Sequence, residues 1–313
     1  MGVEGQMAFR PFRLRPAILR CQRGKRRNHA VNTAQASSEL DLLLSLAEQA
    51  LVAAYGAATD HVALQNAKGD AVRAFDLAAH AAIERHLARS GLPLVLYSEE
   101  GVPRHLGRGA PQMRVIVDPV DGSDNFARGL PFAAMSNFCA AIAPPTGLLD
   151  IATVRTAVIH PLMGEEVVFL LHRGTAFMRR TDGVTPLAVN DVKALRDAMV
   201  SVELNHHAPG VPLAEVMGKA RGVRTLGCCS AALLAVARGQ LDAHIDIRGR
   251  LTPESWLAAA AMVRAAGGVV ILLDNALERT QPPANLLQRC SLVAAATPEL
   301  MEEILMHLRK TFL

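Results

Sequence analysis

The chain has few aromatic residues and no long apolar run. Aromatic residues make up 4% of its 313 residues, and Trp256 is the only tryptophan. A hydrophobic core must therefore rely on aliphatic side chains, which the hydrophobic content of 50% can supply. No uninterrupted apolar run reaches the roughly 18–20 residues of a membrane-spanning helix, so no membrane association is expected. The length leaves room for two modest domains or one large one.

The five cysteines do not follow the pattern of a disulfide framework or a zinc site. Their number is odd, and only Cys228 and Cys229 are close in sequence. No CxxC spacing suggests zinc, and adjacent cysteines rarely bridge each other without strain. Reduced thiols in a cytoplasmic protein are the simplest interpretation.

Positive charge is concentrated at the N-terminus. Residues 1–37 carry eight Arg and Lys side chains and one acid, Glu4, for a net charge of +7, whereas the whole chain is +4. The remainder is therefore about −3, and the pI near 9.0 gives no reason to expect a nucleic-acid partner. We expect residues 1–37 to be a disordered tail. An organellar transit peptide and a stretch added by an early start codon stay open as alternatives.

Hydrophobic periodicity predicts alternating helices and strands after the tail. Apolar residues from Leu40 to Leu51 recur at helical spacing, which predicts a helix over 39–58. The pattern changes near 183–192, which suggests an N-terminal subdomain over 38–186 and a C-terminal α/β subdomain over 187–313. Further helices are predicted over 72–90, 211–221, 229–238, 253–266 and 297–310. Strands are predicted over 94–97, 113–117, 133–142, 152–160, 166–171, 174–179, 199–202, 241–247, 269–273 and 291–295. This mixture indicates a layered α/β fold.

The most informative motif is Asp118-Pro119-Val120-Asp121-Gly122-Ser123-Asp124-Asn125, which directly follows an apolar run. It places two carboxylates where a buried strand is predicted to end. Proline fixes φ and glycine permits a sharp turn, so Asp118, Asp121 and the Val120 carbonyl can be directed at one point. Oxygen ligands of this kind suit a hard cation such as Mg²⁺. A polar surface turn is the alternative, because Asp-Pro and Asp-Gly are common turn dipeptides.

Other segments strengthen the first interpretation by their order along the chain. They are Ser98-Glu99-Glu100-Gly101 after a predicted strand, Gly227-Cys228-Cys229-Ser230, Trp256-Leu257-Ala258-Ala259-Ala260, and Gly267-Gly268. Together with residues 118–126, which closely match Asp-Pro-Ile/Leu/Val-Asp-Gly-Ser/Thr-x-Asn-Phe, they resemble the inositol monophosphatase family, including archaeal members that also act on fructose 1,6-bisphosphate. The resemblance runs from about residue 40 to the C-terminus. It implies an α/β (α+β layered) sandwich of alternating helix and sheet layers in two subdomains, like other sugar phosphatases.

The resemblance also implies a Mg²⁺-dependent phosphomonoesterase that hydrolyses a small phosphorylated polyol or sugar with a metal-activated water. Family members are often dimeric, so it further implies a homodimer. The implied metal ligands are Glu99, Asp118, the Val120 carbonyl and Asp121. The implied catalytic residues are Asp76, Glu99 and Ser123. The implied substrate-binding residues are Gly122, Ser123, Gly227, Cys229, Asp246 and Arg248. Taken singly, Glu99 and Asp76 also fit solvated surface positions, and Asp246 with Arg248 also fits a surface pair.

One position departs from the family pattern. The second family signature resembles Trp-Asp-x-Ala-Ala-Gly, and Leu257 stands where its aspartate would complete a second metal site. Leucine supplies no ligand, so affinity for a second metal should fall. Glu254 lies three residues earlier, on roughly the same helical face. A catalytically impaired relative that binds a phosphorylated ligand or partner is therefore the alternative to an active enzyme. A nucleotidase acting on 3′-phosphoadenosine phosphate would use the same metal framework.

Overall fold

The structure is a computed structural model that describes residues 30–57, 62–65, 71–130, 136–163, 167–205 and 213–310. Most of the basic tail and the beginning of the strand predicted over 133–142 lie outside the described residues. Among the described helices, none combines the length and apolar character needed to cross a membrane.

The larger sheet has eight strands in the order β10-β9-β8-β7-β6-β5-β3-β4. Neighbouring strands pair antiparallel except β3 and β5, which are parallel. The strands are β3 (Leu94–Ser98), β4 (Arg104–Leu106), β5 (Met113–Asp121), β6 (Asn137–Ala143), β7 (Thr156–Pro161), β8 (Val167–His172), β9 (Thr175–Arg180) and β10 (Gly183–Pro186).

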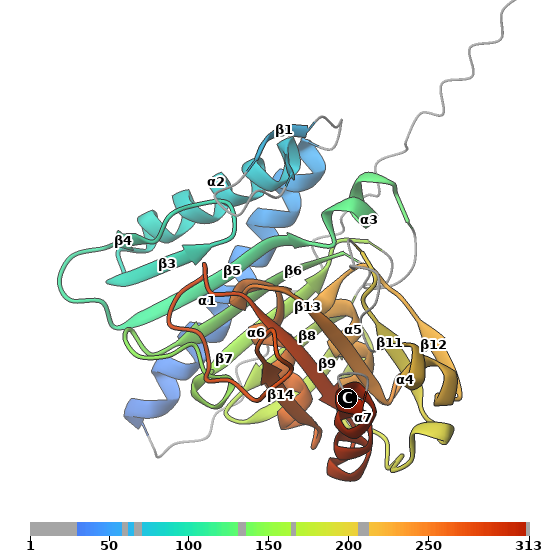
Figure 1. The fold of residues 1–313 in the computed structure, drawn as a ribbon. Coiled ribbons are helices and arrows are strands. Elements are labelled where there is room, and N and C mark those ends of the chain that lie inside the picture. Colours follow the sequence, from blue (N-terminus) through green and yellow to red (C-terminus); the bar gives the residue numbers. More distant parts are fainter. Residues whose placement is uncertain are drawn as a thin grey trace, which may run out of the picture.

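Two long helices, α1 (Ala30–Gly56) and α2 (Ala74–Ser90), cover the outer face of this sheet and lie side by side (Figure 1). Their apolar faces bury aliphatic side chains of β3, β5 and β6 in an outer core. A small hairpin of β1 (Val62–Gln65) and β2 (Ala71–Arg73) leads into α2. The helix α1 begins well before the predicted residue 39, whereas α2 begins close to its predicted start.

The second sheet has five strands in the order β12-β11-β13-β15-β14. The pairs β12–β11 and β11–β13 are parallel, and the pairs β13–β15 and β15–β14 are antiparallel. Its outer face packs against α4 (Leu213–Lys219) and α7 (Pro298–Lys310). The strands are β11 (Met199–Val202), β12 (Gly222–Arg224), β13 (Ala243–Leu251), β14 (Val269–Leu273) and β15 (Cys290–Ala295).

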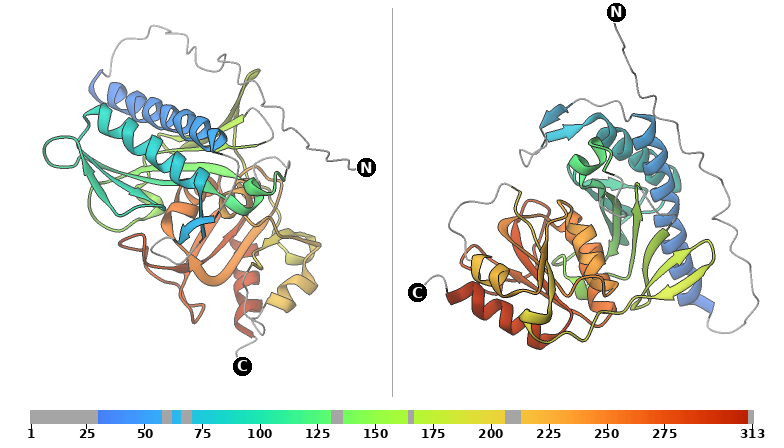
Figure 2. Two further views of the ribbon diagram at one scale, coloured as in Figure 1. Left: turned by 90° about the horizontal axis from the view of Figure 1, so that it is seen from above. Right: turned by 90° about the vertical axis from the view of Figure 1, so that its right-hand side faces the viewer.

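Two helices, α5 (Cys229–Ala237) and α6 (Pro253–Ala265), fill the space between the sheets (Figure 2). They share one inner core with side chains from both sheets, and Trp256 is fully buried there. The alanine run of α6 lets both sheets approach the helix closely. The molecule is thus a sandwich of helix, sheet, helix, sheet and helix layers, which confirms the predicted layered α/β fold. The helices α5 and α6 pack against both sheets, so the inner core continues across the predicted boundary near residue 186. The division into two subdomains stays a prediction.

Several elements differ from the sequence-based prediction. The strand β5 continues beyond the predicted residue 117 through the signature to Asp121, and the short helix α3 (Ser123–Ala127) follows it. The segment at Ile151–Thr153 forms a 3₁₀ turn, so the strand predicted from residue 152 begins only at Thr156. The short strands β1, β2, β4, β10 and β12 were not predicted. With three or four residues each, they are too short to show a clear alternation of apolar side chains.

A buried histidine of the second sheet should make the fold sensitive to acid. His244 of β13 is 1% exposed, and burial lowers its pKa to about 4 from an ordinary value of 6.5, with Asp246 opposing the shift and Arg248 adding to it. Between these two pH values the unfolded chain binds a proton that the folded chain does not. The stabilising contribution is therefore complete above pH 6.5 and is lost as the pH falls towards 4.

We predict that unfolding by urea will show this loss. Lowering the pH from about 7.5 to about 5 should reduce the free energy of unfolding of the native chain by about 2 kcal/mol more than that of His244→Gln. The other titrating groups are common to both proteins and cancel in the comparison. An equal pH dependence of the two proteins would contradict the prediction.

Candidate active site

The strand β5 directs Asp118 into the layer between the two sheets. Successive side chains of a strand point to opposite faces. Val115 and Val117 belong to the outer core beneath α1 and α2, whereas Ile116 belongs to the inner core with α5 and α6. Asp118 continues the alternation on the inner face and is 2% exposed.

The signature forms a bulge at the end of β5. The pairing with β6 shifts in register between Asp118 and Asp121, and the Val120 N–H donates to the Asp118 Oδ1 at 3.0 Å. Gly122 then adopts a left-handed conformation with φ of 81° at the start of α3, where a residue with a Cβ would be strained. The Ser136 hydroxyl donates to the Gly122 carbonyl at 2.8 Å and holds this turn. The second carboxylate of the motif, Asp121, is also buried.

Four carboxylates influence one another around Asp118. Burial raises the pKa of Asp118 well above its ordinary value, and Glu99, Asp121 and Glu254 raise it further. The carboxyl of Glu99 is hydrogen-bonded to Asp118. The Glu99 N–H donates to the Val117 carbonyl at 3.1 Å, which extends the parallel pairing of β3 with β5 and places Glu99 beside the motif. The structure therefore brings together three of the predicted residues from two neighbouring strand ends.

Asp121 is bound by the start of α5. Its Oδ2 accepts the Ser230 N–H at 2.7 Å and the Cys228 thiol at 3.1 Å. Burial raises the pKa of Asp121, and these hydrogen bonds oppose the shift. The Asn137 side chain donates to the Ser230 hydroxyl at 2.9 Å and links β6 to the same point.

The sequence singled out Cys229, but the structure places the neighbouring Cys228 against the signature. Cys229 is 8% exposed, and burial raises the pKa of its thiol, with Asp121 and Asp246 adding to the shift. Ser230 and Cys228 were not predicted as site residues. No sequence signal distinguishes which of two adjacent thiols faces the motif.

The loop before α5 is fixed by the signature itself. The Asn125 amide donates to the Leu226 carbonyl at 2.9 Å. Gly227 adopts φ of +65°, and a Cβ there would lie 3.4 Å from Asn205 and 3.5 Å from Asn125. Gly227 thus lies beside the motif, and its substrate-binding role stays a prediction. Asn125 is therefore a positioning residue for this loop. Its place within residues 118–126 is the sequence feature that could have identified it.

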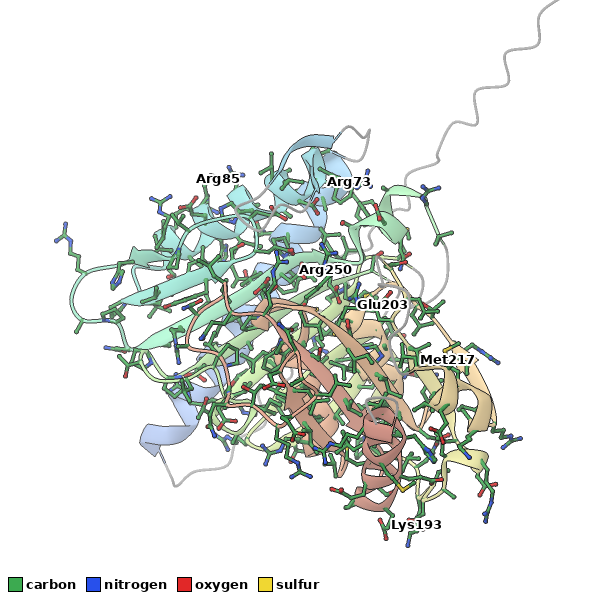
Figure 3. All side chains as sticks on the ribbon, viewed as in Figure 1. Arg73, Arg85, Lys193, Glu203, Met217 and Arg250 are labelled. Atoms are coloured by element: carbon green, nitrogen blue, oxygen red, sulfur yellow. The ribbon has the colours of Figure 1, made fainter. Side chains whose placement is uncertain are left out.

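Asp76 lies at the start of α2 and is 3% exposed. It accepts the Arg73 N–H at 2.9 Å, and the Arg73 guanidinium pairs with Asp124 of α3. Burial raises the pKa of Asp76 to about 7, the Arg73 hydrogen bond opposes the shift, and Glu99 and Asp124 add to it. The effect of Glu99 shows that Asp76 lies near the carboxylate cluster. Figure 3 marks Arg73 at this end of α2, and Ser123 begins α3 as a half-buried residue.

Asp246 and Arg248 form an internal ion pair at the end of the second sheet. The guanidinium donates to both carboxylate oxygens of Asp246, at 2.9 and 2.6 Å, and to the Asn205 carbonyl at 2.9 Å. Asp246 has 0% exposure, whereas the Arg248 side chain is 14% exposed. Glu203, marked in Figure 3, is buried nearby and accepts the N–H groups of residues 204 and 205. Arg248 is therefore the more accessible member of the predicted pair.

The donor set around Asp118 fits a hard divalent cation. All of its ligands would be oxygen atoms, from Glu99, Asp118, Asp121 and the Val120 carbonyl. The neighbouring carboxyls raise the pKa of Asp118, and a bound cation would favour its ionised form instead. In the part of the chain that the structure describes, however, no three His, Cys, Asp or Glu side chains are already arranged around a metal position. Oxygens of two of these carboxylates accept hydrogen bonds within the protein, at Asp118 from the Val120 N–H and at Asp121 from Ser230 and Cys228.

Leu257, the departure from the family pattern, lies in the inner core. Its side chain has 0% exposure, and it packs in the same core as Trp256 and Ile116. The acidic residue of α6 is Glu254, in its first turn, and this is the residue that acts on Asp118.

A family model confirms the resemblance. The model of the inositol monophosphatase family matches residues 27–311. The chain belongs to the inositol monophosphatase family. Among relatives, it is 28% identical over 240 residues to a fructose-1,6-bisphosphatase/inositol-1-monophosphatase of Thermococcus kodakarensis, covering 77% of this chain and 84% of the relative. It is 29% identical over 184 residues to the Nus factor SuhB of Pseudomonas aeruginosa, covering 56% of this chain and 62% of that protein. The solved structure of inositol monophosphate-bound SaIMPase-II has the same fold, with a TM-score of 0.67, 17% identity, and coverage of 87% of this chain and 94% of that one.

Proposed function

We propose that this family member is a Mg²⁺-dependent phosphomonoesterase that hydrolyses an inositol phosphate or a sugar phosphate. The observation that carries the proposal is the gathering of half-buried Glu99 with buried Asp118 and Asp121 at two neighbouring strand ends. Buried like charges are costly unless a cation neutralises them. The name of the Thermococcus relative supports the substrate class.

Each residue would have a defined task. Glu99, Asp118, Asp121 and the Val120 carbonyl would hold Mg²⁺, which when bound neutralises phosphate charge and acidifies water. Asp76, with a pKa raised to about 7, is suited to accept a proton from the attacking water near neutral pH. The Ser123 hydroxyl would orient that water. The alcohol that leaves would take its proton from a second water.

The substrate would lie between the signature and the second sheet. The backbone N–H groups of Gly122 and Ser123 would donate to phosphate oxygens. Gly227 and Cys229 would line the polyol side through the backbone of the loop. Arg248, held by Asp246, would present its remaining exposed surface to a second anionic group. A homodimer and a cytoplasmic location stay predictions.

The direct test is phosphate release by the full-length protein. Inositol 1-phosphate, fructose 1,6-bisphosphate and a broad panel of other phosphomonoesters are incubated with and without Mg²⁺. We expect release from at least one polyol or sugar phosphate that requires Mg²⁺ and stops on chelation. Absence of release from the whole panel at every Mg²⁺ concentration would contradict the proposal.

Two observations favour a second candidate, a protein that binds a phosphorylated ligand or partner without hydrolysing it. Asp121 is already engaged by Ser230 and Cys228, and Leu257 leaves the signature without its usual aspartate. The relative from Pseudomonas aeruginosa is named as a Nus factor and not as a phosphatase, which is consistent with this candidate. Calorimetric binding of a phosphorylated polyol with no release of phosphate would favour this candidate.

A further inference from the structure

The helix α6 lies across the face of β5 that carries Asp118. Ile116 of β5 and Leu257 of α6 belong to the same inner core. The next residue of β5 on that face is Asp118, and the residue one helical turn before Leu257 on α6 is Glu254. These two steps lead to two buried carboxylates, Asp118 and Glu254, on elements that pack against each other in the same core.

Glu254 has a setting that is unusual for a glutamate in a first helical turn. It is 2% exposed, and glutamate is rarely buried to this extent unless it is paired. The Thr252 hydroxyl donates to its Oε1, which fixes the direction of the side chain. The effect of Glu254 extends to the thiol of Cys290, whose pKa is raised to about 12, first by burial. Glu254 therefore lies in the buried layer between the two sheets, on a helix that packs in the same core as β5.

We propose that Glu254 is a ligand of the divalent-cation site and takes the place of the aspartate missing from the second family signature. The inference rests on the proposed function, since it concerns the same cation site. A glutamate has one methylene more than an aspartate, and this added reach suits a residue placed one turn before Leu257 on the helix. With Asp118 and Asp121, Glu254 would give the second cation position three carboxylates.

A purely structural role is the competing explanation. An acidic residue in the first turn of a helix interacts favourably with the helix dipole. Glu299 of α7 provides a matched comparison, because it also follows a proline that begins the helix. The Glu299 side chain is 57% exposed and pairs with Lys193 at the surface. A carboxylate can therefore interact with the helix dipole while exposed to solvent, so this interaction does not explain why Glu254 is buried.

The experiment measures cation binding and not only activity. Full-length protein is titrated with Mn²⁺, and free Mn²⁺ is followed by electron paramagnetic resonance in the native chain, Glu254→Gln and Glu299→Gln. We expect Glu254→Gln to bind at least about ten-fold more weakly or to lose one bound equivalent, since even indirect partners of a metal site cost this much. Glu299→Gln should bind like the native chain. Unchanged affinity and stoichiometry in Glu254→Gln would overturn the inference.

Two further variants keep the test decisive. If Glu254→Gln does not fold, as judged by circular dichroism, Glu254→Asp is titrated, and binding as tight as in the native chain overturns the inference. Leu257→Asp places a carboxylate in the apolar core, so we expect it to lower the thermal midpoint without tightening Mn²⁺ binding. Tighter Mn²⁺ binding by Leu257→Asp would overturn the inference, because it would show that position 257 faces the site.

The failure of the inference is distinguishable from failure of the proposed function. If the native chain binds Mn²⁺ and releases phosphate while Glu254→Gln binds Mn²⁺ equally well, only the role of Glu254 is wrong. If the native chain neither binds Mn²⁺ nor releases phosphate, the proposed function itself is wrong, and the role of Glu254 falls with it.

Discussion

Replacing Asp118 by asparagine should abolish phosphate release while leaving the metal-free protein at least as stable as the native chain. Asp118 is 2% exposed, and it is the carboxyl on which the effects of Glu99, Asp121 and Glu254 converge. A bound metal contributes several kcal/mol to transition-state stabilisation, and each 1.36 kcal/mol is ten-fold in rate. We therefore expect Asp118→Asn to lower kcat by about a thousand-fold or more.

The stability of the same variant distinguishes a functional carboxylate from a structural one. Burial and three neighbouring carboxyls disfavour the ionised form of Asp118, so an amide of equal size removes an unfavourable charge. The thermal midpoint of Asp118→Asn without metal should equal or exceed that of the native chain, and added Mg²⁺ should stabilise it less. Asp191→Asn, at an 89% exposed side chain, serves as the control with native activity. Activity within ten-fold of native in Asp118→Asn, or a clear loss of metal-free stability, would contradict the prediction.

The signature could be interpreted from sequence because its geometry is local. An apolar run followed by Asp118, Pro119, Asp121 and Gly122 specifies a strand, its end and a sharp turn within a few residues. Glu99 was indicated only by the resemblance, and the structure shows why it lies close to Asp118, since it follows β3, which pairs with β5. The order of these segments also indicated the family, and with it the layered fold that the structure shows.

The contacts of the middle helices could not be predicted in the same way. The helix α6 is buried on nearly all sides, so its apolar residues show no periodicity that would reveal which side faces the site. Motif matching therefore directed attention to Leu257, whereas the structure buries both Leu257 and Glu254, one helical turn apart, in the layer that also contains Asp118. The same limitation applies at the start of α5, where the sequence does not reveal that Cys228 contacts Asp121, and the substrate-binding role of Cys229 stays a prediction.

Arg114, four residues before Asp118 on β5, should be among the most important side chains for stability. It is 2% exposed, and its guanidinium donates to the carbonyls of residues 144, 146, 147 and 148, at 2.6, 3.1, 2.9 and 3.3 Å. The same guanidinium lies 6.0 Å from the centre of the Tyr97 ring. One side chain thus binds four backbone carbonyls at the start of the connection between β6 and β7.

We predict that Arg114→Met will lower the free energy of unfolding by about 3 kcal/mol, because four backbone carbonyls lose a buried charged donor together. The control is Arg196→Met, whose side chain is 83% exposed and which should change stability by less than about 0.5 kcal/mol. Urea unfolding measures both, and equal stabilities would contradict the prediction.

At temperatures where Arg114→Met stays folded, its kcat should remain close to native, since Arg114 contacts no residue of the carboxylate cluster in the described contacts. Opposite outcomes for Arg114→Met and Asp118→Asn would show that one end of β5 stabilises the fold while the other end holds charges that only a bound cation makes favourable.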